Sequence, residues 1–252
     1  MNRILTIGGS DTSGGAGVQA DIETINELGA NTFNIITAVT AQSNENFYHS
    51  HPVPAKTLQA QLDSIDCSKI GAIKIGMLPN LGSVQIVKDF LMKTKPIKSV
   101  LDPVLKSTSG GPLSTQNGIC SVISSLFSLA TLITPNSMEA EFFTKITTSN
   151  KNDLIRQSQA LLEMGPSAVL VKGGHLGTES SPDILAQKNQ EVFVFDRKRI
   201  RQASNVRGTG CRLASAIAFY LASGIQIFES VEKGTEYLQG YLNTQAASKP
   251  KG

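Results

Sequence analysis

This chain of 252 residues contains few of the residue types that mark specialised classes of protein. It has no tryptophan, 3 histidines and 3 cysteines. The cysteines, Cys67, Cys120 and Cys211, are scattered and odd in number, which argues against both a disulfide framework and a metal site. Their pattern favours a reducing, cytoplasmic environment.

The chain also lacks long apolar runs and a strong charge of either sign. No stretch approaches 18 consecutive apolar residues, and the first residues show no hydrophobic signal core, so we expect neither a membrane span nor secretion. The formal net charge of +3 is too small to indicate a nucleic-acid partner. One basic cluster, Arg197–Arg199 with Arg201, is expected at a solvated strand end.

Short apolar runs alternate with helical patterns along the whole chain. Many of the runs are too apolar to face water on one side, which is typical of strands covered by helices on both faces. We therefore predict an α/β fold: a three-layer α/β/α architecture with a mostly parallel sheet, in one domain over residues 1–252 with a frayed tail from about 245. The expected strands are Ile4–Ile7, Phe33–Thr37, Ala72–Ile75, Ser99–Leu101, Thr131–Thr134, Ala168–Val171 and Val192–Phe195; the expected helices are Gly17–Leu28, Ala55–Ile65, Val84–Met92, Leu154–Met164 and Arg212–Ser223.

Polar or glycine residues follow the carboxyl ends of six expected strands. In open parallel sheets, ligands bind beyond these ends, so the sequence predicts one site built from several loops. The loops are Gly8–Gly17, Val39–Ser43, Gly76-Met77, Asp102-Pro103, Pro135–Glu139 and Lys172–His175.

The most informative segment is Gly208-Thr209-Gly210-Cys211, which opens an apolar helix. Such a turn leaves backbone N–H groups unpaired at a helix start, where the dipole adds about half a positive charge. The same dipole is expected to lower the pKa of the Cys211 thiol, which makes it a candidate base or nucleophile. The segment predicts phosphate binding and phosphoryl transfer. The alternative is a tight turn followed by a small buried cysteine.

The first loop contains a misleading match to the dinucleotide fingerprint, beginning at Gly15 and ending at Ala20. In that fold the first glycine closely follows the strand, whereas here about seven residues intervene. No Gly-Lys-Ser/Thr sequence is present either, which excludes a P-loop. We expect the loop to wrap a small polar substrate, with Asp21 entering from the following helix. Asp11 is either part of that site or a turn residue.

Taken together, these stretches resemble the ribokinase-like superfamily, and within it the hydroxymethylpyrimidine and phosphomethylpyrimidine kinases. The similarity runs in order from about residue 3 to about residue 220. It implies a ribokinase-like fold, a homodimer, and the ATP- and Mg²⁺-dependent phosphorylation of 4-amino-5-hydroxymethyl-2-methylpyrimidine and then of its monophosphate, in thiamine biosynthesis. The motifs that carry it are Ile7–Asp21, Ile36–Gln42, Ile73–Leu78, Leu101–Val104, Leu132–Asn136, Val169–His175 and Gly208–Cys211.

For the phosphate side, the resemblance implies that Cys211 is the base, where most of the superfamily has aspartate. Gly208, Thr209 and Gly210 then supply N–H donors to the transferring phosphoryl group. The remaining implied residues are Lys172, Asn136 and Asp102 for ATP and phosphate, with Glu139 holding hydrated magnesium. Alternatively, Asn136 caps the helix that follows and Glu139 completes a capping box.

For the substrate side, the resemblance implies contacts from Gly9, Asp21, Gln42, Met77 and Val104. An amide such as that of Gln42 offers an N–H and a C=O together, which suits the adjacent donor and acceptor of the pyrimidine edge. Met77 supplies a polarisable wall for the ring, although read alone it is more often a core residue. His175 is either part of the site or a loop residue.

The chain departs from the usual pattern of this branch at four positions. Val206 and Arg207 stand where threonine and histidine are usual, and Arg212 stands in place of a threonine. Arginine grips phosphate with two parallel hydrogen bonds, so we expect Arg207 and Arg212 to bind phosphate or to change which phosphorylated molecule is preferred. Lys106 follows the Asp102 motif and either meets a substrate phosphate or points into solvent.

Three functions remain open from the sequence. The first is the pyrimidine kinase, the second is a pyridoxal kinase of the cysteine-bearing type, and the third is a ligand sensor that no longer transfers phosphate. The presence of Cys211, Lys172, Asn136 and Glu139 argues against the sensor, because a pure binding protein does not need all four.

Overall fold

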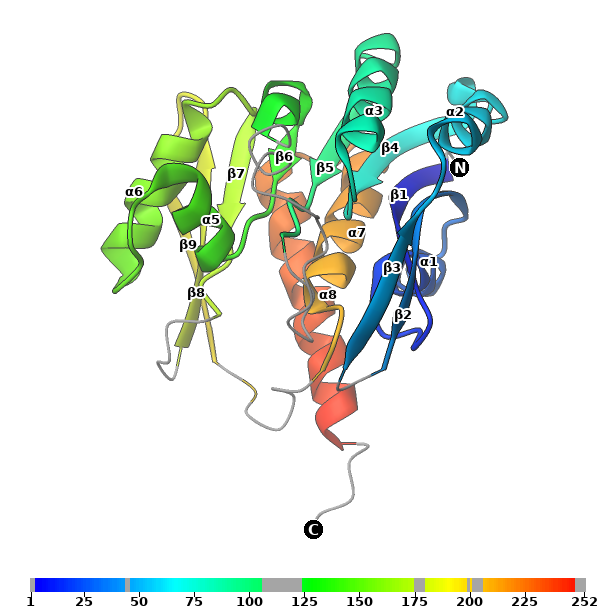
Figure 1. Cartoon of the computed structure of the whole chain (residues 1–252). Coiled ribbons are helices and arrows are strands. Elements are labelled where there is room, and N and C mark those ends of the chain that lie inside the picture. Colours follow the sequence, from blue (N-terminus) through cyan, green and yellow to red (C-terminus); the bar gives the residue numbers. More distant parts are fainter. Residues whose placement is uncertain are drawn as a thin grey trace.

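The computed structural model describes residues 3–43, 46–105, 124–174, 180–198, 200 and 206–247 (Figure 1). The strands are β1 (Arg3–Asp11), β2 (Thr32–Gln42), β3 (Phe47–Pro52), β4 (Ile70–Ile75), β5 (Lys98–Leu101), β6 (Leu132–Ile133), β7 (Ala168–Val171), β8 (Ser180–Gln187) and β9 (Phe193–Lys198). The helices are α1 (Gly17–Glu27), α2 (Ala55–Asp63), α3 (Leu81–Lys93), α5 (Ser137–Thr144), α6 (Lys151–Leu162), α7 (Thr209–Ala222) and α8 (Ile227–Ala247), with short 3-10 turns at Cys67–Lys69 and Ser124–Leu129.

All described strands join one sheet in the order β3-β2-β1-β4-β5-β6-β7-β8-β9. Strands β1, β2 and β4 to β7 are parallel, whereas β3, β8 and β9 are added antiparallel to their neighbours at the two edges. The predicted mostly parallel sheet is confirmed. After β1 the chain adds β2 on one side and later β4 on the other, which makes the boundary between β1 and β4 a topological switch point.

Helices cover both faces of the sheet, as the apolar runs predict. Helices α1, α7 and α8 pack together on one face, while α2, α3, α5 and α6 lie on the other (Figure 1). Each face of the sheet has its own hydrophobic core, and successive residues of a strand point alternately into the two cores. Ile4 packs into the core under α1, α7 and α8, and Leu5 packs into the core on the opposite face. Burying each such side chain stabilises the fold by about 1.5–3 kcal/mol.

The seven predicted strands and five predicted helices are all present, with boundaries shifted by a few residues. Helix α3 begins earlier than predicted because Asn80 caps it, accepting from the Ser83 N–H at 2.9 Å. Strands β3 and β8 and helix α8 are additional, and α5 is the helix after Asn136 that the sequence offered as an alternative. Strand β3 is mostly polar and lies at the sheet edge, so it lacks the apolar run that marks a central strand. Among the described helices, none combines the length and apolar character that a bilayer crossing requires.

Candidate active site

The starts of α1 and α7 meet at the carboxyl edge of the central strands. Gly208 has φ +69°, and a Cβ on it would lie 2.2 Å from the Gly15 carbonyl oxygen, so the contact requires glycine. Neither helix has a side-chain N-cap hydrogen bond. The backbone N–H groups and the positive dipole ends of the two helix starts therefore face the same edge, an arrangement suited to anions.

Cys211 lies in the first turn of α7, and its sulfur accepts a hydrogen bond from the Gly17 N–H at the start of α1. Burial raises the pKa of the thiol above its ordinary value, although the charge of Lys74 and the Gly17 hydrogen bond act in the opposite direction. The expected lowering of this pKa is therefore wrong in direction. The loss of water around the sulfur is the largest cause of this rise, and the carboxylates of Asp21 and Asp102 add to it.

A buried ion pair lies beneath Cys211. Lys74 of β4 and Asp21 of α1 are both fully buried, with Lys74 Nζ at 2.8 and 2.9 Å from the two oxygens of Asp21. Ser215 of α7 donates to the same carboxylate at 2.8 Å. Burial lowers the pKa of Lys74, but the charges of Asp21 and Cys211 together raise it above its ordinary range, so the ammonium is retained.

Lys74 is a site residue that was not predicted from the sequence, although a lysine inside the apolar run Ala72–Ile75 is the signal that marks it. Burial raises the pKa of Asp21. Both oxygens of this carboxylate already bind the protein, so its direct contact with a substrate stays a prediction. What the structure shows is that Asp21 joins α1, β4 and α7 under the site.

A second ion pair lies beside the start of α7. Lys172, at the end of β7, contacts Asp102 at 2.8 Å, and Thr134 donates to the same Asp102 oxygen at 3.0 Å. A Cβ on Gly210 would lie 3.2 Å from Lys172 Nζ and 3.3 Å from Asp102 Oδ2. The predicted phosphate residues Gly210, Lys172 and Asp102 are thus in mutual contact, although they come from three separate loops.

Asn136 and Glu139 form the capping box that the sequence offered as an alternative. The Asn136 side chain accepts from the Glu139 N–H at 2.9 Å, and Glu139 accepts from the Asn136 N–H at 2.8 Å. Glu139 is 5% exposed, and burial raises its pKa to about 7, with the Lys172 charge acting against that shift. A bound cation would restore the ionised form, so capping and metal binding are compatible roles.

The predicted substrate residues lie on the neighbouring strand ends. A Cβ on Gly9 would lie 2.7 Å from the Met77 sulfur, so these two residues touch. Met77 is buried, and its carbonyl oxygen accepts from the Thr37 hydroxyl at 2.7 Å. Val104 is half-buried directly after Asp102, and Gln42 ends β2.

The two arginines differ in their surroundings. Arg212 forms an ion pair with Glu23, and its guanidinium lies 4.1 Å from the centre of the Tyr241 ring. These partners belong to the outer helical layer, so phosphate binding by Arg212 stays a prediction that requires this ion pair to open. Arg207 instead contacts the first loop and the end of β2, with Asp11 Oδ2 at 3.4 Å and Gln42 Oε1 at 2.6 Å.

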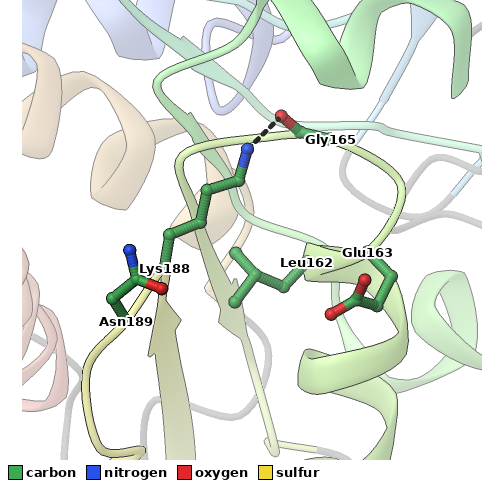
Figure 2. Close-up of a pocket in the computed structure, with 5 residues that line it drawn as sticks. All are labelled: Leu162, Glu163, Gly165, Lys188 and Asn189. Carbon is green, nitrogen blue, oxygen red and sulfur yellow. Dashed lines mark hydrogen bonds between the residues drawn. The ribbon is translucent and has the colours of Figure 1, made fainter.

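One surface pocket lies away from these residues. It has a volume of about 320 Å³ and is lined by Leu162, Glu163, Gly165, Lys188 and Asn189 (Figure 2). Lys188 Nζ donates to the Gly165 carbonyl oxygen at 3.3 Å. This pocket adjoins the amino end of β7, whereas the candidate site lies at its carboxyl end, so it is separate from the site.

Three residues considered in the sequence lie outside the described residues: Lys106, Cys120 and His175.

The fold and the site define a small-molecule kinase of ribokinase-like architecture: a mostly parallel sheet with paired helix starts, a cysteine and a lysine at its carboxyl edge. The family model described as phosphomethylpyrimidine kinase matches residues 11–251, and the chain belongs to that family. It is therefore a phosphotransferase, and ATP is the phosphate donor that a kinase of this family implies.

Named relatives agree with this assignment. The chain is 35% identical to the hydroxymethylpyrimidine/phosphomethylpyrimidine kinase of Rhizobium meliloti, over 95% of this chain and 90% of that protein. It is 36% identical to a probable thiamine biosynthetic bifunctional enzyme of Oryza sativa over 95% of this chain, but it spans only 44% of that protein's length.

Solved structures show the same similarity. A phosphomethylpyrimidine kinase from Clostridium difficile superimposes with a TM-score of 0.83 at 36% identity, covering 96% of this chain and 100% of that one. The pyridoxal kinase from Staphylococcus aureus in complex with pyridoxal superimposes with a TM-score of 0.87 at 26% identity, covering 96% and 88%.

Proposed function

We propose that this chain transfers the γ-phosphoryl group of ATP to 4-amino-5-hydroxymethyl-2-methylpyrimidine and then to its monophosphate, in thiamine biosynthesis. The observation that carries the proposal is the meeting of two helix starts around Cys211, in contact with the Lys172–Asp102 pair. This arrangement supports positioning and charge stabilisation, which supply most of the catalysis in phosphoryl transfer. We further propose one kinase domain over residues 1–252, a homodimer and a cytoplasmic location.

In this proposal the substrate ring lies against Met77 and Gly9, and its hydroxymethyl group points towards Cys211. The reacting form of Cys211 is the thiolate, which accepts the hydroxyl proton as the oxygen attacks phosphorus. The Gly17 N–H and Lys74 stabilise that thiolate. The N–H groups of residues 208–210 receive the phosphoryl oxygens, and Lys172 offsets their charge.

Magnesium fits the site as an ion held through water and phosphate. In the described part of the chain, no three His, Cys, Asp or Glu side chains form a cluster that could hold a metal by themselves. Magnesium in kinases is commonly bound by one or two carboxylates together with substrate phosphates and water, and Glu139 and Asp102 are the carboxylates in position. Bound there, Mg²⁺ would neutralise charge that builds up on the phosphates.

The test is ATP consumption in the presence of magnesium, with the hydroxymethylpyrimidine, its monophosphate and pyridoxal compared side by side. We expect turnover on both pyrimidines, and a loss of at least about 100-fold in Cys211→Ala, since a general base contributes at that scale. Binding of the pyrimidine to Cys211→Ala, measured by calorimetry, is the matched control, and we expect it to persist.

Pyridoxal phosphorylation is the second candidate, and the high TM-score with a pyridoxal kinase favours it. Turnover on pyridoxal alone would move the chain to vitamin B6 salvage. Binding of a pyrimidine without turnover on any of the three would indicate the ligand sensor, and both results contradict the proposal.

A further inference from the structure

Arg207 has a more specific arrangement than a free phosphate-binding arginine. It lies two residues before α7, and its side chain is 6% exposed. Its Nη1 donates to Ser13 Oγ at 2.6 Å and to the Ser43 carbonyl oxygen at 2.8 Å, and its Nη2 donates to Gln42 Oε1 at 2.6 Å. One guanidinium thus joins the first loop, the end of β2 and the start of α7.

The charge of Arg207 is already balanced within the protein. The carboxylate of Asp11 lies 3.4 Å from Nη2 and is itself 1% exposed on its side chain. It also accepts hydrogen bonds from the N–H groups of Ser13 and Ala16, at 3.0 and 2.8 Å. Because a buried charge pair of this kind is costly to separate, Arg207 is held as part of the scaffold.

The contact with Gln42 sets the orientation of its amide. A guanidinium carries only donors, so the amide atom facing Arg207 has to be the oxygen. The Nε2 group therefore lies on the opposite side, where it donates to Thr40 Oγ1 at 3.0 Å. Thr40 uses its own hydrogen to donate to the Ser10 carbonyl oxygen at 2.9 Å, so it can only accept from Gln42.

These hydrogen bonds run in one direction from Arg207 through Gln42 and Thr40 to Ser10. Turning the Gln42 amide by 180° would place N–H against N–H at Arg207 and would leave the Thr40 oxygen facing a carbonyl. Nε2 carries two hydrogens, and among the described residues the Thr40 oxygen accepts one of them.

We propose that Arg207 is a positioning residue for substrate specificity. It fixes the Gln42 amide so that Nε2–H donates to an acceptor on the substrate ring, whereas a donor on the ring has to reach Oε1, which lies on the side of Arg207. This inference rests on the proposed function, in which Gln42 reads the pyrimidine edge. A 4-aminopyrimidine presents an amino donor beside a ring-nitrogen acceptor and matches this order. The corresponding 4-oxo ring presents an acceptor beside a ring N–H and reverses it.

The experiment compares the binding of these two rings, 4-amino- and 4-oxo-5-hydroxymethyl-2-methylpyrimidine, by calorimetry without ATP. We expect wild type to bind the amino ring at least about 10-fold more tightly, because a mismatched edge leaves polar groups unpaired. In Arg207→Met the amide loses one of its two orienting contacts and is held by Thr40 alone, so we expect the ratio to fall below about 3-fold. Arg207→Lys, whose ammonium also carries only donors, should retain most of the preference.

Ser13→Ala is the matched control, because it removes another Arg207 partner and leaves the Gln42 contact in place. It should keep the wild-type ratio. A purely structural role for Arg207 predicts equal weakening of both rings in Arg207→Met, and an unchanged ratio there overturns the proposal. Thermal unfolding of each variant confirms that the protein measured is folded.

Kinetic measurements separate this inference from the proposed function. With ATP present, Arg207→Met should raise KM for the amino ring and leave kcat within about 3-fold, because Arg207 orients a binding group and does not touch the reacting atoms. Wild type that binds the amino ring selectively without turnover contradicts the proposed function alone. Turnover by wild type with an Arg207-independent ring preference contradicts this inference alone.

Discussion

Replacing Lys74 with methionine tests the buried ion pair beneath Cys211. The change keeps most of the side-chain volume but removes the ammonium, and among the described residues the Asp21 carboxylate then keeps the hydrogen bond from Ser215 alone. Removing one partner of a buried pair typically costs about 3–5 kcal/mol, because the other charge stays buried without compensation. For a chain of this size, that loss corresponds to a fall of about 10 °C in Tm.

The second variant in this test is Lys74→Met combined with Asp21→Asn. The double variant has no charge at these two buried positions, and the amide still has Ser215 as a hydrogen-bonding partner. We expect it to recover at least half of the stability lost in Lys74→Met, since replacing both members of a buried pair is often close to neutral. Urea unfolding followed by circular dichroism measures all three proteins.

The pH dependence of the stability of Lys74→Met provides an independent test of the ion pair. Burial already raises the pKa of Asp21, and removing Lys74 raises it further. A carboxyl group with a raised folded-state pKa contributes stability that is lost as pH rises through that pKa. Lys74→Met should therefore lose more stability relative to wild type at pH 8 than at pH 5. A loss below about 1 kcal/mol, or a double variant no more stable than the single one, would show that the Lys74–Asp21 pair does not stabilise the fold in this way.

Three further predictions concern the site. Because burial raises the pKa of the Cys211 thiol, kcat/KM and the rate of Cys211 alkylation should both rise with pH through the neutral range and beyond pH 9; a flat profile contradicts a thiolate base. Because Glu139 has a pKa of about 7, its ionisation should lower the stability of the wild type as pH rises from 5 to 8. Glu139→Gln should therefore become more stable relative to wild type over that interval, and saturating Mg²⁺ with ATP should reduce this difference in stability. A difference in stability that does not change with pH argues against a buried ionisation. In Gly208→Ala the new Cβ would meet the Gly15 carbonyl oxygen at a left-handed φ, so the substitution should cost more than about 1 kcal/mol of stability and lower turnover. A Cβ at Gly240 of α8 would meet no atom within 4 Å, so Gly240→Ala should be neutral or stabilising by about 0.5–1 kcal/mol. Equal effects of the two variants in chemical denaturation would contradict the contact between Gly208 and Gly15.

Much of the fold was predictable because the apolar runs of the central strands identify them from the local sequence. Runs such as Ala168–Val171 are apolar on both faces, and only a sheet covered on both sides buries them. The edge strand β3 has no such pattern and was not predicted; helix α8 was not predicted either, although Ile227, Val231 and Leu238 follow helical spacing and pack into one core. The polar loops at the strand ends predicted the position of the site for the same topological reason.

The chemistry within the site was less predictable. The sequence places Cys211 at a helix start, which favours a lowered pKa, but burial decides the direction and raises it. The sequence also shows Arg207 beside the glycine turn, where a phosphate contact is a natural interpretation. In the structure the Arg207 side chain instead forms an ion pair with Asp11 and a hydrogen bond with Gln42, two residues that lie far away along the chain.

Local apolar patterns, glycines and chain order were enough to predict the layers, the mostly parallel sheet, the loops that meet at one edge and the glycine turn that opens α7. The pairing of charges, in contrast, is visible in the three-dimensional structure and not in the local sequence. Lys74 with Asp21, Lys172 with Asp102 and Arg207 with Asp11 join residues separated by tens to hundreds of positions. Burial and charge pairing depend on these distant neighbours, and they set the protonation of Cys211 and the orientation of Gln42.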